Sequence, residues 1–356
     1  MFDSGFFVSL FGFLIVLTPL VFIHELGHYF AAIKAGVKVE SFSIGFGPEL
    51  FGFKDKRNTR WKFSLFPLGG YVKMKGDLVS SEKIDNKSSS NKDTFLQASL
   101  FNRFIIVLSG PLANLILGIL LISSIYVFNG RYVSPPIIDK VLVAQPAQLG
   151  GVYSGDKILS INNNKINDFK DIKEIVEANP ETLLVFKVLR SNTILNLSII
   201  PINFYDKKTN KTLGRIGVTA KPFELKKLSF LNACLFGFYD SIKMTIDWIS
   251  GLKSLLLLDV NKKDIIGPVG IAKISGSSLD KGVISVIFLM AVLSINLGLI
   301  NLLPIPALDG GYILLFTYEL IFRKPLPTVI QMNLLKFGFI FLISLMVLVT
   351  AFDLGF

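Results

Sequence analysis

Four long apolar runs constrain what this chain of 356 residues can fold into. None of them contains a charged side chain, and they cover residues 4–23, 104–130, 282–308 and 337–352. A helix needs about 17–25 mostly apolar residues to cross a bilayer, because each residue advances it by about 1.5 Å. The sequence therefore predicts a polytopic α-helical membrane protein with about four transmembrane helices, the fourth slightly short. A mean hydropathy of +0.57 agrees with this class.

The first apolar run could instead be a signal peptide that is removed. However, Asp3 stands where such peptides have a basic start, and no small-residue cleavage site follows the run. We therefore expect residues 4–23 to remain in the protein as the first transmembrane helix.

Basic residues beside the apolar runs predict the orientation in the membrane. The stretch between the first two runs is rich in them: Lys34, Lys38, Lys54, Lys56, Arg57, Arg60, Lys62, Lys73, Lys75 and Arg103. Basic loops stay in the cytoplasm, so we expect this stretch and residues 323–336 inside. Residues 131–265 and both termini then face outward. The basic character of the long outer region is no obstacle, because long loops translocate largely regardless of charge.

Composition argues against two other classes of protein. The net charge of +11 could indicate nucleic-acid binding, but no run of arginines interleaved with aromatics supports it. Membrane proteins also collect Lys and Arg in their cytoplasmic loops, so we expect no nucleic-acid partner. Cys234 is the single cysteine, which leaves no intramolecular disulfide and no multi-cysteine metal site.

Residues 132–222 are expected to form a separate β-rich domain. β-branched segments punctuated by Gly, Asn and Pro predict strands at residues 137–143, 157–161, 183–189 and 194–200. The run from Pro146 to Asn162 resembles a PDZ domain, a fold that binds extended peptides as an added strand. A β-rich domain without a ligand is the alternative.

The segment from Phe230 to Val260 is apolar but interrupted by charge. Asp240, Lys243 and Asp247 fall on one helical face opposite an apolar one, which favours a helix lying on the membrane surface. A fifth span is the alternative.

The chemistry is indicated by His24-Glu25-Leu26-Gly27-His28 at the end of the first run. H-E-x-x-H spacing on a helix places both imidazoles on one face, where they can hold one zinc ion. Glu25 would act as the general base for a zinc-activated water, whose pKa falls to about 7. A chance arrangement is improbable because the chain has only two histidines.

A catalytic zinc site needs a third protein ligand, and Asp309 is the candidate. It follows the third apolar run in Asn301-Leu302-Leu303-Pro304-Ile305-Pro306-Ala307-Leu308-Asp309-Gly310-Gly311. Two prolines break the helix, so this stretch should be partly extended and lie against protein or a cavity. The first and third runs both pass inward, which allows their ends to meet at one depth nearer the cytoplasm.

Several motifs together resemble the site-2 protease family of intramembrane metalloproteases. These are the H-E-x-x-H helix, Ser109-Gly110-Pro111-Leu112-Ala113-Asn114, the PDZ-like insert, the Asp309 segment, and Glu40 to Gly47 with Phe66 to Met74. The resemblance covers essentially the whole chain. It implies Zn²⁺ bound by His24, His28 and Asp309, catalysis by Glu25, and substrate handling by Asn301, Pro304 and Pro306.

The same resemblance implies substrates and a location. Substrates would be transmembrane segments of other proteins, such as anti-sigma-factor-like proteins and signal-peptide remnants. The protein would be a monomer in the lipid bilayer of a bacterial inner membrane, with the PDZ-like domain on the periplasmic side. Two departures stand out: there is one PDZ-like domain where well-known relatives have two, and Tyr312 stands where some relatives carry His.

A transmembrane substrate must unwind before its amides can be reached, and the cytoplasmic loop offers a means of holding it. Residues 61–65 and 71–75 alternate around Pro67 and Gly69-Gly70 and predict membrane-associated strands. Addition of the substrate as a strand, near Leu65 and Val72, would hold the opened peptide. The alternative is that these strands only pack the loop. Residues 80–91 predict a flexible connection.

These expectations divide the chain into successive segments. They are residues 1–35 (first transmembrane helix with the zinc motif), 36–102 (cytoplasmic loop with β-strands), 103–130 (second transmembrane helix), 131–222 (PDZ-like domain), 223–281 (amphipathic membrane-surface helices), 282–322 (third transmembrane helix with the Asp309 segment), 323–336 (cytoplasmic connection) and 337–356 (fourth transmembrane helix).

Two other functions compete with the intramembrane protease. A membrane-anchored protease with its site in a soluble domain would place H-E-x-x-H away from a span, whereas here the motif continues one. A non-catalytic scaffold that presents its PDZ-like domain to partners would have lost catalytic groups, whereas every expected group is present.

Overall fold

The computed structural model describes residues 4–77, 93–206, 211–257 and 266–355. The chain forms two compact units, a helical one made of residues 1–128 and 230–356 and a β-rich one made of residues 129–229. The flexible connection predicted at residues 80–91 lies outside the described residues.

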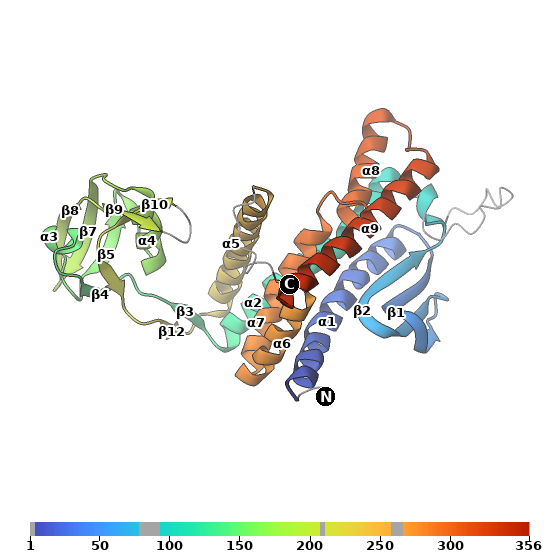
Figure 1. The fold of residues 1–356 in the computed structure, drawn as a ribbon, viewed down its shortest axis with the longest axis horizontal. Coiled ribbons are helices and arrows are strands. Elements are labelled where there is room, and N and C mark those ends of the chain that lie inside the picture. Colours follow the sequence, from blue (N-terminus) through green and yellow to red (C-terminus); the bar gives the residue numbers. More distant parts are fainter. Residues whose placement is uncertain (1–3, 78–92, 207–210, 258–265, 356) are drawn as a thin grey trace. The chain divides into compact units, whose positions relative to one another are not determined.

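Within the described residues, four helices of the helical unit are long and apolar enough to cross a membrane, as predicted. They are α1 (Ser4–Lys34), α2 (Leu100–Phe128), α7 (Val283–Asn301) and α9 (Thr328–Asp353) (Figure 1). The ends of the third and fourth helices can now be placed. The third apolar run extends to Leu308, but its helix ends at Asn301, and the prolines that follow break it as predicted. The fourth begins nine residues earlier than expected, at Thr328 rather than Phe337, and its 26 residues suffice to span.

Helix α2 lies between α1 and α7 and brings these two together. Glycines allow the backbones to approach closely, as is common between membrane helices. Gly27 of α1 contacts the backbone of Ser109, and a Cβ at Gly298 of α7 would lie 2.9 Å from the carbonyl oxygen of Pro111. The helix that carries the two histidines is therefore fixed against the one that precedes Asp309.

Two long bent strands lie beside α1, β1 (Val39–Lys54) and β2 (Arg60–Met74). Residues 39–44 of β1 pair with residues 70–74 of β2 on one side and with residues 60–63 on the other. Gly45 and Gly47 have positive φ angles at the bend of β1, a conformation that glycine adopts without strain. The two short strands expected at residues 61–65 and 71–75 are therefore halves of one strand, and both pair with β1, which sequence analysis did not predict.

Three further helices complete this unit: α5 (Phe230–Leu256), α6 (Pro268–Lys281) and α8 (Asp309–Phe322). Helix α5 packs along α2, where Tyr126 Oη donates a hydrogen bond of 2.7 Å to Asp240. The charged face expected at the membrane surface is thus partly turned toward α2. Apolar side chains of α5 that include Phe238 and Ile246 are exposed instead.

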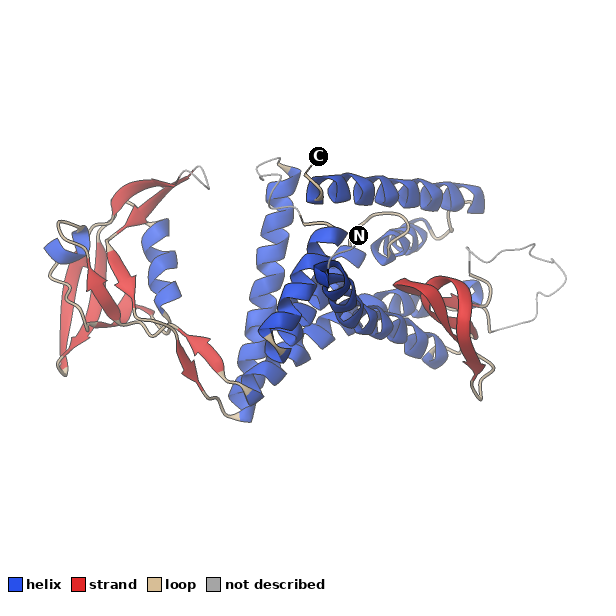
Figure 2. Cartoon of the chain, turned by 60° about the horizontal axis from the view of Figure 1, so that its bottom comes forward, coloured by secondary structure: helices blue, strands red, loops and turns tan. Residues whose placement is uncertain are grey.

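The β-rich unit contains the predicted strands. Among the described residues, its largest sheet has the order β6-β5-β7-β8, from β5 (Lys157–Ile161), β6 (Asn164–Lys165), β7 (Leu184–Arg190) and β8 (Thr193–Ile199). Figure 2 draws the strands in red and the helices in blue. Smaller pairs join β4 (Ile138–Val141) to β11 (Val218–Ala220), β9 (Ile202–Asp206) to β10 (Lys211–Arg215), and β3 (Arg131–Val133) to β12 (Glu224–Lys226).

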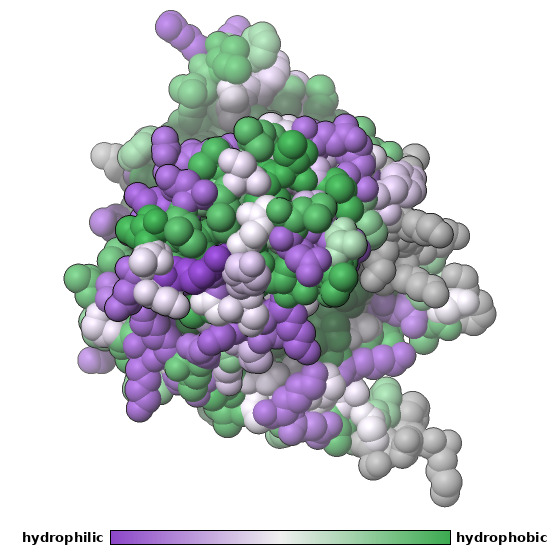
Figure 3. Space-filling view, turned by 90° about the vertical axis from the view of Figure 1, so that its left-hand side faces the viewer, coloured by the Kyte–Doolittle hydropathy of each residue, from purple (hydrophilic) through white to green (hydrophobic). Residues whose placement is uncertain are grey.

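Two short helices, α3 (Pro146–Leu149) and α4 (Phe169–Ala178), complete the β-rich unit. Its core gathers buried side chains from the sheet and from α4, among them Ile158, Phe186 and Ile172. The unit thus has a core of its own, as a separate domain should. The side of the molecule seen in Figure 3 carries hydrophilic and hydrophobic side chains next to one another.

Candidate metal centre

The two histidines of α1 face each other across one helical turn. Their ring centroids are 4.8 Å apart, and their Nε2 atoms are 3.2 Å apart. Both residues are buried, His24 with 7% and His28 with 8% of their surface exposed. The four-residue spacing in a helix therefore places both imidazoles as the motif predicted.

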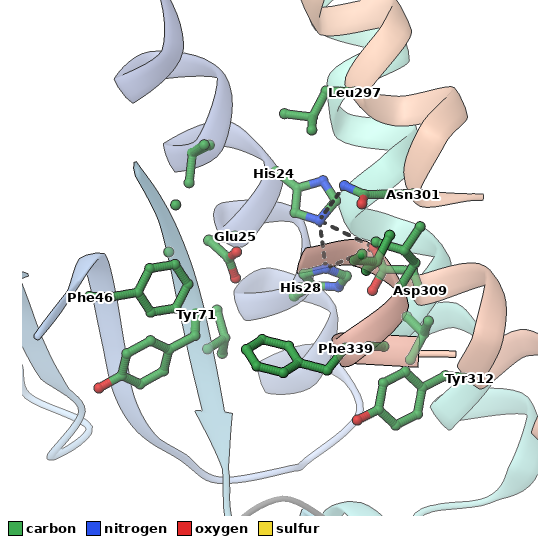
Figure 4. Close-up of a pocket in the computed structure, with 18 of the residues that line it drawn as sticks. His24, Glu25, His28, Phe46, Tyr71, Leu297, Asn301, Asp309, Tyr312 and Phe339 are labelled. Atoms are coloured by element: carbon green, nitrogen blue, oxygen red, sulfur yellow. Dashed lines mark hydrogen bonds and ion pairs between the residues drawn. The ribbon is translucent and has the colours of Figure 1, made fainter. Parts of the chain in front are cut away.

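Asp309, at the first position of α8, completes a group of three donors (Figure 4). Its Oδ2 atom lies 3.2 Å from Nε2 of His24 and 3.5 Å from Nε2 of His28. Although Oδ2 is buried, it has no hydrogen-bond partner in the described part of the chain. Three lone-pair donors thus converge at one point, an arrangement that costs free energy unless a cation lies between them.

The distances between these donors are compatible with a tetrahedral zinc ion. Zinc with bonds of about 2.0–2.1 Å to nitrogen and oxygen in tetrahedral geometry separates its ligand atoms by about 3.3–3.4 Å. The three observed separations are 3.2, 3.2 and 3.5 Å. Three protein ligands also leave the fourth position open, as catalytic zinc sites require.

The break between α7 and α8 is what brings Asp309 to the histidines. Residues 302–308 form turns, and Ala307 adopts a φ angle of +80°. The first turn of α8 packs tightly against this segment, since a Cβ at Gly311 would lie 2.7 Å from Cα of Pro306. The two glycines after Asp309 therefore allow the helix to begin where its first side chain reaches the histidines.

Helix α2 orients the histidine rings from behind. Nδ1 of His28 donates a hydrogen bond of 2.8 Å to the carbonyl oxygen of Ile106. A protonated Nδ1 leaves the lone pair on Nε2, the atom that faces the other donors. Gly110 of α2 packs against the same ring, and sequence analysis assigned it no role.

A cavity of about 880 Å³ opens onto the three donors. Glu25 lines it beside them, as do Gly70, Tyr71 and Val72 of β2. Helix α9 contributes Phe339, with Leu342, Ile343 and Met346, to the same cavity. The cavity therefore joins the candidate general base, a strand and the donors, and it is mostly apolar.

The five predicted substrate-handling residues are placed differently from one another. Val72 and Asn301 line the cavity, and Nδ2 of Asn301 lies 3.4 Å from Nε2 of His24. Leu65, Pro304 and Pro306 are not among its lining residues. Leu65 is 47% exposed on the sheet, while the prolines belong to the turn that carries Asp309.

Comparison with known proteins places the chain in a family. Residues 12–345 match the model of Peptidase family M50. The chain belongs to peptidase family M50. A Rickettsia conorii protein named as a candidate zinc metalloprotease is 38% identical over 98% of both chains. An Agrobacterium fabrum protein with a similar name is 35% identical, over 96% of this chain and 94% of its own.

Two further matches cover most of the chain or about a quarter of it. A protein of Enterococcus faecalis named as a candidate protease, eep, is 31% identical over 96% of this chain and 97% of its own. Among solved structures, the PDZ domain of an SdrC-like protein from Listeria monocytogenes covers 24% of this chain and 87% of its own, with 18% identity and a TM-score of 0.21.

Membership of family M50 confirms the resemblance to site-2 proteases and the zinc dependence predicted from the sequence. The protein is a zinc metalloprotease with helices that can span a membrane. The non-catalytic scaffold is therefore set aside. Sequence analysis assigned no role to Gly110, Asn114 or the α9 residues at the cavity. Their contacts depend on tertiary packing that no spacing within one helix reveals.

Proposed function

We propose that this protease hydrolyses peptide bonds within transmembrane segments of other membrane proteins. Zinc would be held by His24, His28 and Asp309, with Glu25 as general base. The observation that carries the proposal is the convergence of these three donors within the bundle that contains all four candidate membrane spans. Such a site meets substrates that are themselves in the membrane.

Bound zinc supplies Lewis acidity, which activates water and polarises a peptide carbonyl. The chain's own groups perform the remaining steps. The Glu25 carboxylate accepts the proton of the attacking water and returns it to the leaving amine. The amide of Asn301 lies 3.4 Å from His24 Nε2, which supports the proposal that it donates a hydrogen bond to the substrate carbonyl oxygen as that oxygen gains charge.

The second half of β2 is the element best placed to hold an unwound substrate. A Cβ at Gly70 would lie 3.0 Å from Cγ of Glu25, so the strand backbone passes directly beside the general base. A substrate added as a strand along residues 70–74 would present its backbone to the cavity that Val72 lines. Leu65 lies outside the cavity, so we assign this role to residues 70–74.

Finer features of the function extend this proposal. The basic loops favour a bacterial cytoplasmic membrane with residues 36–102 inside and the PDZ-like unit on the periplasmic side. Substrates would include anti-sigma-factor-like proteins and signal-peptide remnants, and the enzyme would act as a monomer.

Cleavage of a model transmembrane substrate by detergent-purified enzyme tests the proposal. Wild type should cleave, Glu25→Gln should lose at least about 10²-fold in rate while retaining zinc, and a chelator should abolish cleavage. Cleavage by Glu25→Gln at the wild-type rate would exclude Glu25 as the base. If Asp309→Ala still bound zinc as tightly as wild type, the assigned ligand set would be wrong.

A further inference from the structure

Asn114 lies behind His24 in the same way that Ile106 lies behind His28. Its side chain is fully buried in α2, and its amide Nδ2 is 3.4 Å from Nδ1 of His24. Its Oδ1 atom has no hydrogen-bond partner within the described residues. A buried amide oxygen without a partner costs about 1–3 kcal/mol, so this orientation needs an explanation.

The requirements of the metal site supply that explanation. His24 presents Nε2 to the other two donors, so Nδ1 must carry the proton when a metal binds. If Nδ1 of His24 carries a proton and faces the amide nitrogen of Asn114, two hydrogen-bond donors point at each other and no acceptor lies between them. Rotating the amide by 180° exchanges the positions of its nitrogen and oxygen with almost no change in shape. The amide oxygen then accepts the Nδ1–H of His24.

We propose that Asn114 is a positioning residue for the metal centre, with Oδ1 accepting a hydrogen bond from Nδ1–H of His24. This inference rests on the proposed role of His24 as a zinc ligand. Both imidazoles are then held by acceptors from α2, the Ile106 carbonyl and the Asn114 amide, although α2 supplies none of the three converging donors.

The Asn114 backbone is fixed by a neighbouring helix. Ser294 Oγ of α7 donates a hydrogen bond of 2.7 Å to the Asn114 carbonyl oxygen, and Ser294 is itself fully buried. The amide thus belongs to a rigid contact between α2 and α7. Such an acceptor restricts the ring orientation of His24 and raises its basicity as a ligand.

Zinc affinity, measured by chelator competition on the detergent-purified full chain, tests the inference. Loss of an outer-shell partner typically costs 10- to 100-fold in metal affinity, so Asn114→Leu should weaken zinc binding by about that factor. Asn114→Asp keeps an acceptor and should bind zinc at least as tightly as wild type. Ser124→Ala, a control on the same helix that removes only a hydrogen bond to the Leu121 carbonyl oxygen, should stay within about threefold of wild type.

The outcomes separate this inference from the proposed function. Asn114→Ala is a second variant with a smaller side chain, in case Asn114→Leu disturbs folding. Wild-type zinc affinity in both variants would overturn the inference. Loss of zinc in His24→Ala alongside that result would leave the proposed ligands intact. Retention of zinc by His24→Ala would overturn both.

A spectroscopic measurement does not depend on any Asn114 variant. The chain has two histidines, so ¹⁵N-histidine labelling gives the ring-nitrogen signals of two imidazoles, which one His28 variant assigns. In the zinc-loaded protein the His24 Nδ1 proton should resonate as a hydrogen-bonded proton and exchange slowly with water. A His24 Nδ1 proton with the shift and exchange rate of an unbonded imidazole would overturn the inference.

Discussion

Gly110→Ala should displace His28 and weaken zinc binding without any change to a ligand. The added Cβ would lie 2.5 Å from Cε1 and 2.9 Å from Cδ2 of the His28 ring, and still closer to Nε2. The ring cannot move aside freely, because its Nδ1 donates to the carbonyl oxygen of Ile106 on the same helix. The clash therefore acts on the atom that is proposed to bind zinc.

The expected magnitude follows from the cost of overpacking. Inserting a methyl group into a well-packed site costs about 1–3 kcal/mol. If the zinc-bound state bears this cost, affinity falls by about 5- to 150-fold, since each 1.4 kcal/mol is a factor of ten. Chelator competition on the purified protein measures the change directly. A fall in cleavage rate at limiting zinc should accompany it, with recovery when zinc is in excess.

Gly118→Ala is the matched control on the same helix. Its added Cβ would lie 2.5 Å from Cγ1 of Ile295, so the clash is comparable but lies away from the three donors. We expect it to lower the thermal unfolding midpoint and to leave zinc affinity within about threefold of wild type. Equal zinc affinities for Gly110→Ala, Gly118→Ala and wild type would show that the packing of α2 does not position His28.

Two further predictions concern the β-sheet. Val72→Pro removes a backbone donor from the strand beside the cavity, so it should abolish cleavage while zinc content stays at one per chain. The control Val72→Ala keeps the donor and should cleave. Cleavage by Val72→Pro would refute strand addition. Burial raises the pKa of Asp55, but hydrogen bonds from Trp61 and Tyr29, and from the backbone of Thr59 and Arg57, outweigh it and lower that pKa below its ordinary value. The ionised carboxylate thus stabilises the fold above its unfolded pKa of about 3.9, and this contribution is lost as pH falls through the lower folded value. Asp55→Asn should therefore lower the unfolding midpoint at pH 7 and narrow its difference from wild type in acid; a constant difference from pH 7 to pH 3 would contradict this.

The helical frame and the three donors could be predicted because each depends on local sequence. Apolar length gave the four candidate spans, and H-E-x-x-H spacing gave the two imidazoles on one face. Two prolines before Asp309 predicted a broken helix, and the break is what lets α8 begin beside α1. Local rules of this kind act within one helix or one turn.

The remaining features depend on contacts between distant segments. Residues 39–54 lack a strict alternation, and the strand they form is defined by its pairing with both halves of β2. The acceptors behind the histidines, the Ile106 carbonyl and the Asn114 amide, lie 78 and 90 residues away along the chain. Contacts of this kind are fixed by helix packing, and a single sequence carries no local signal for them.

Mapping the cut position by mass spectrometry tests the central claim most directly. A model substrate with one apolar transmembrane segment is incubated with zinc-loaded wild type and with Glu25→Gln in the same detergent. The expected result is a new pair of termini inside the apolar segment, produced by wild type and lost in Glu25→Gln. Cuts that fall only in the soluble flanks, or that persist in Glu25→Gln, would contradict the account.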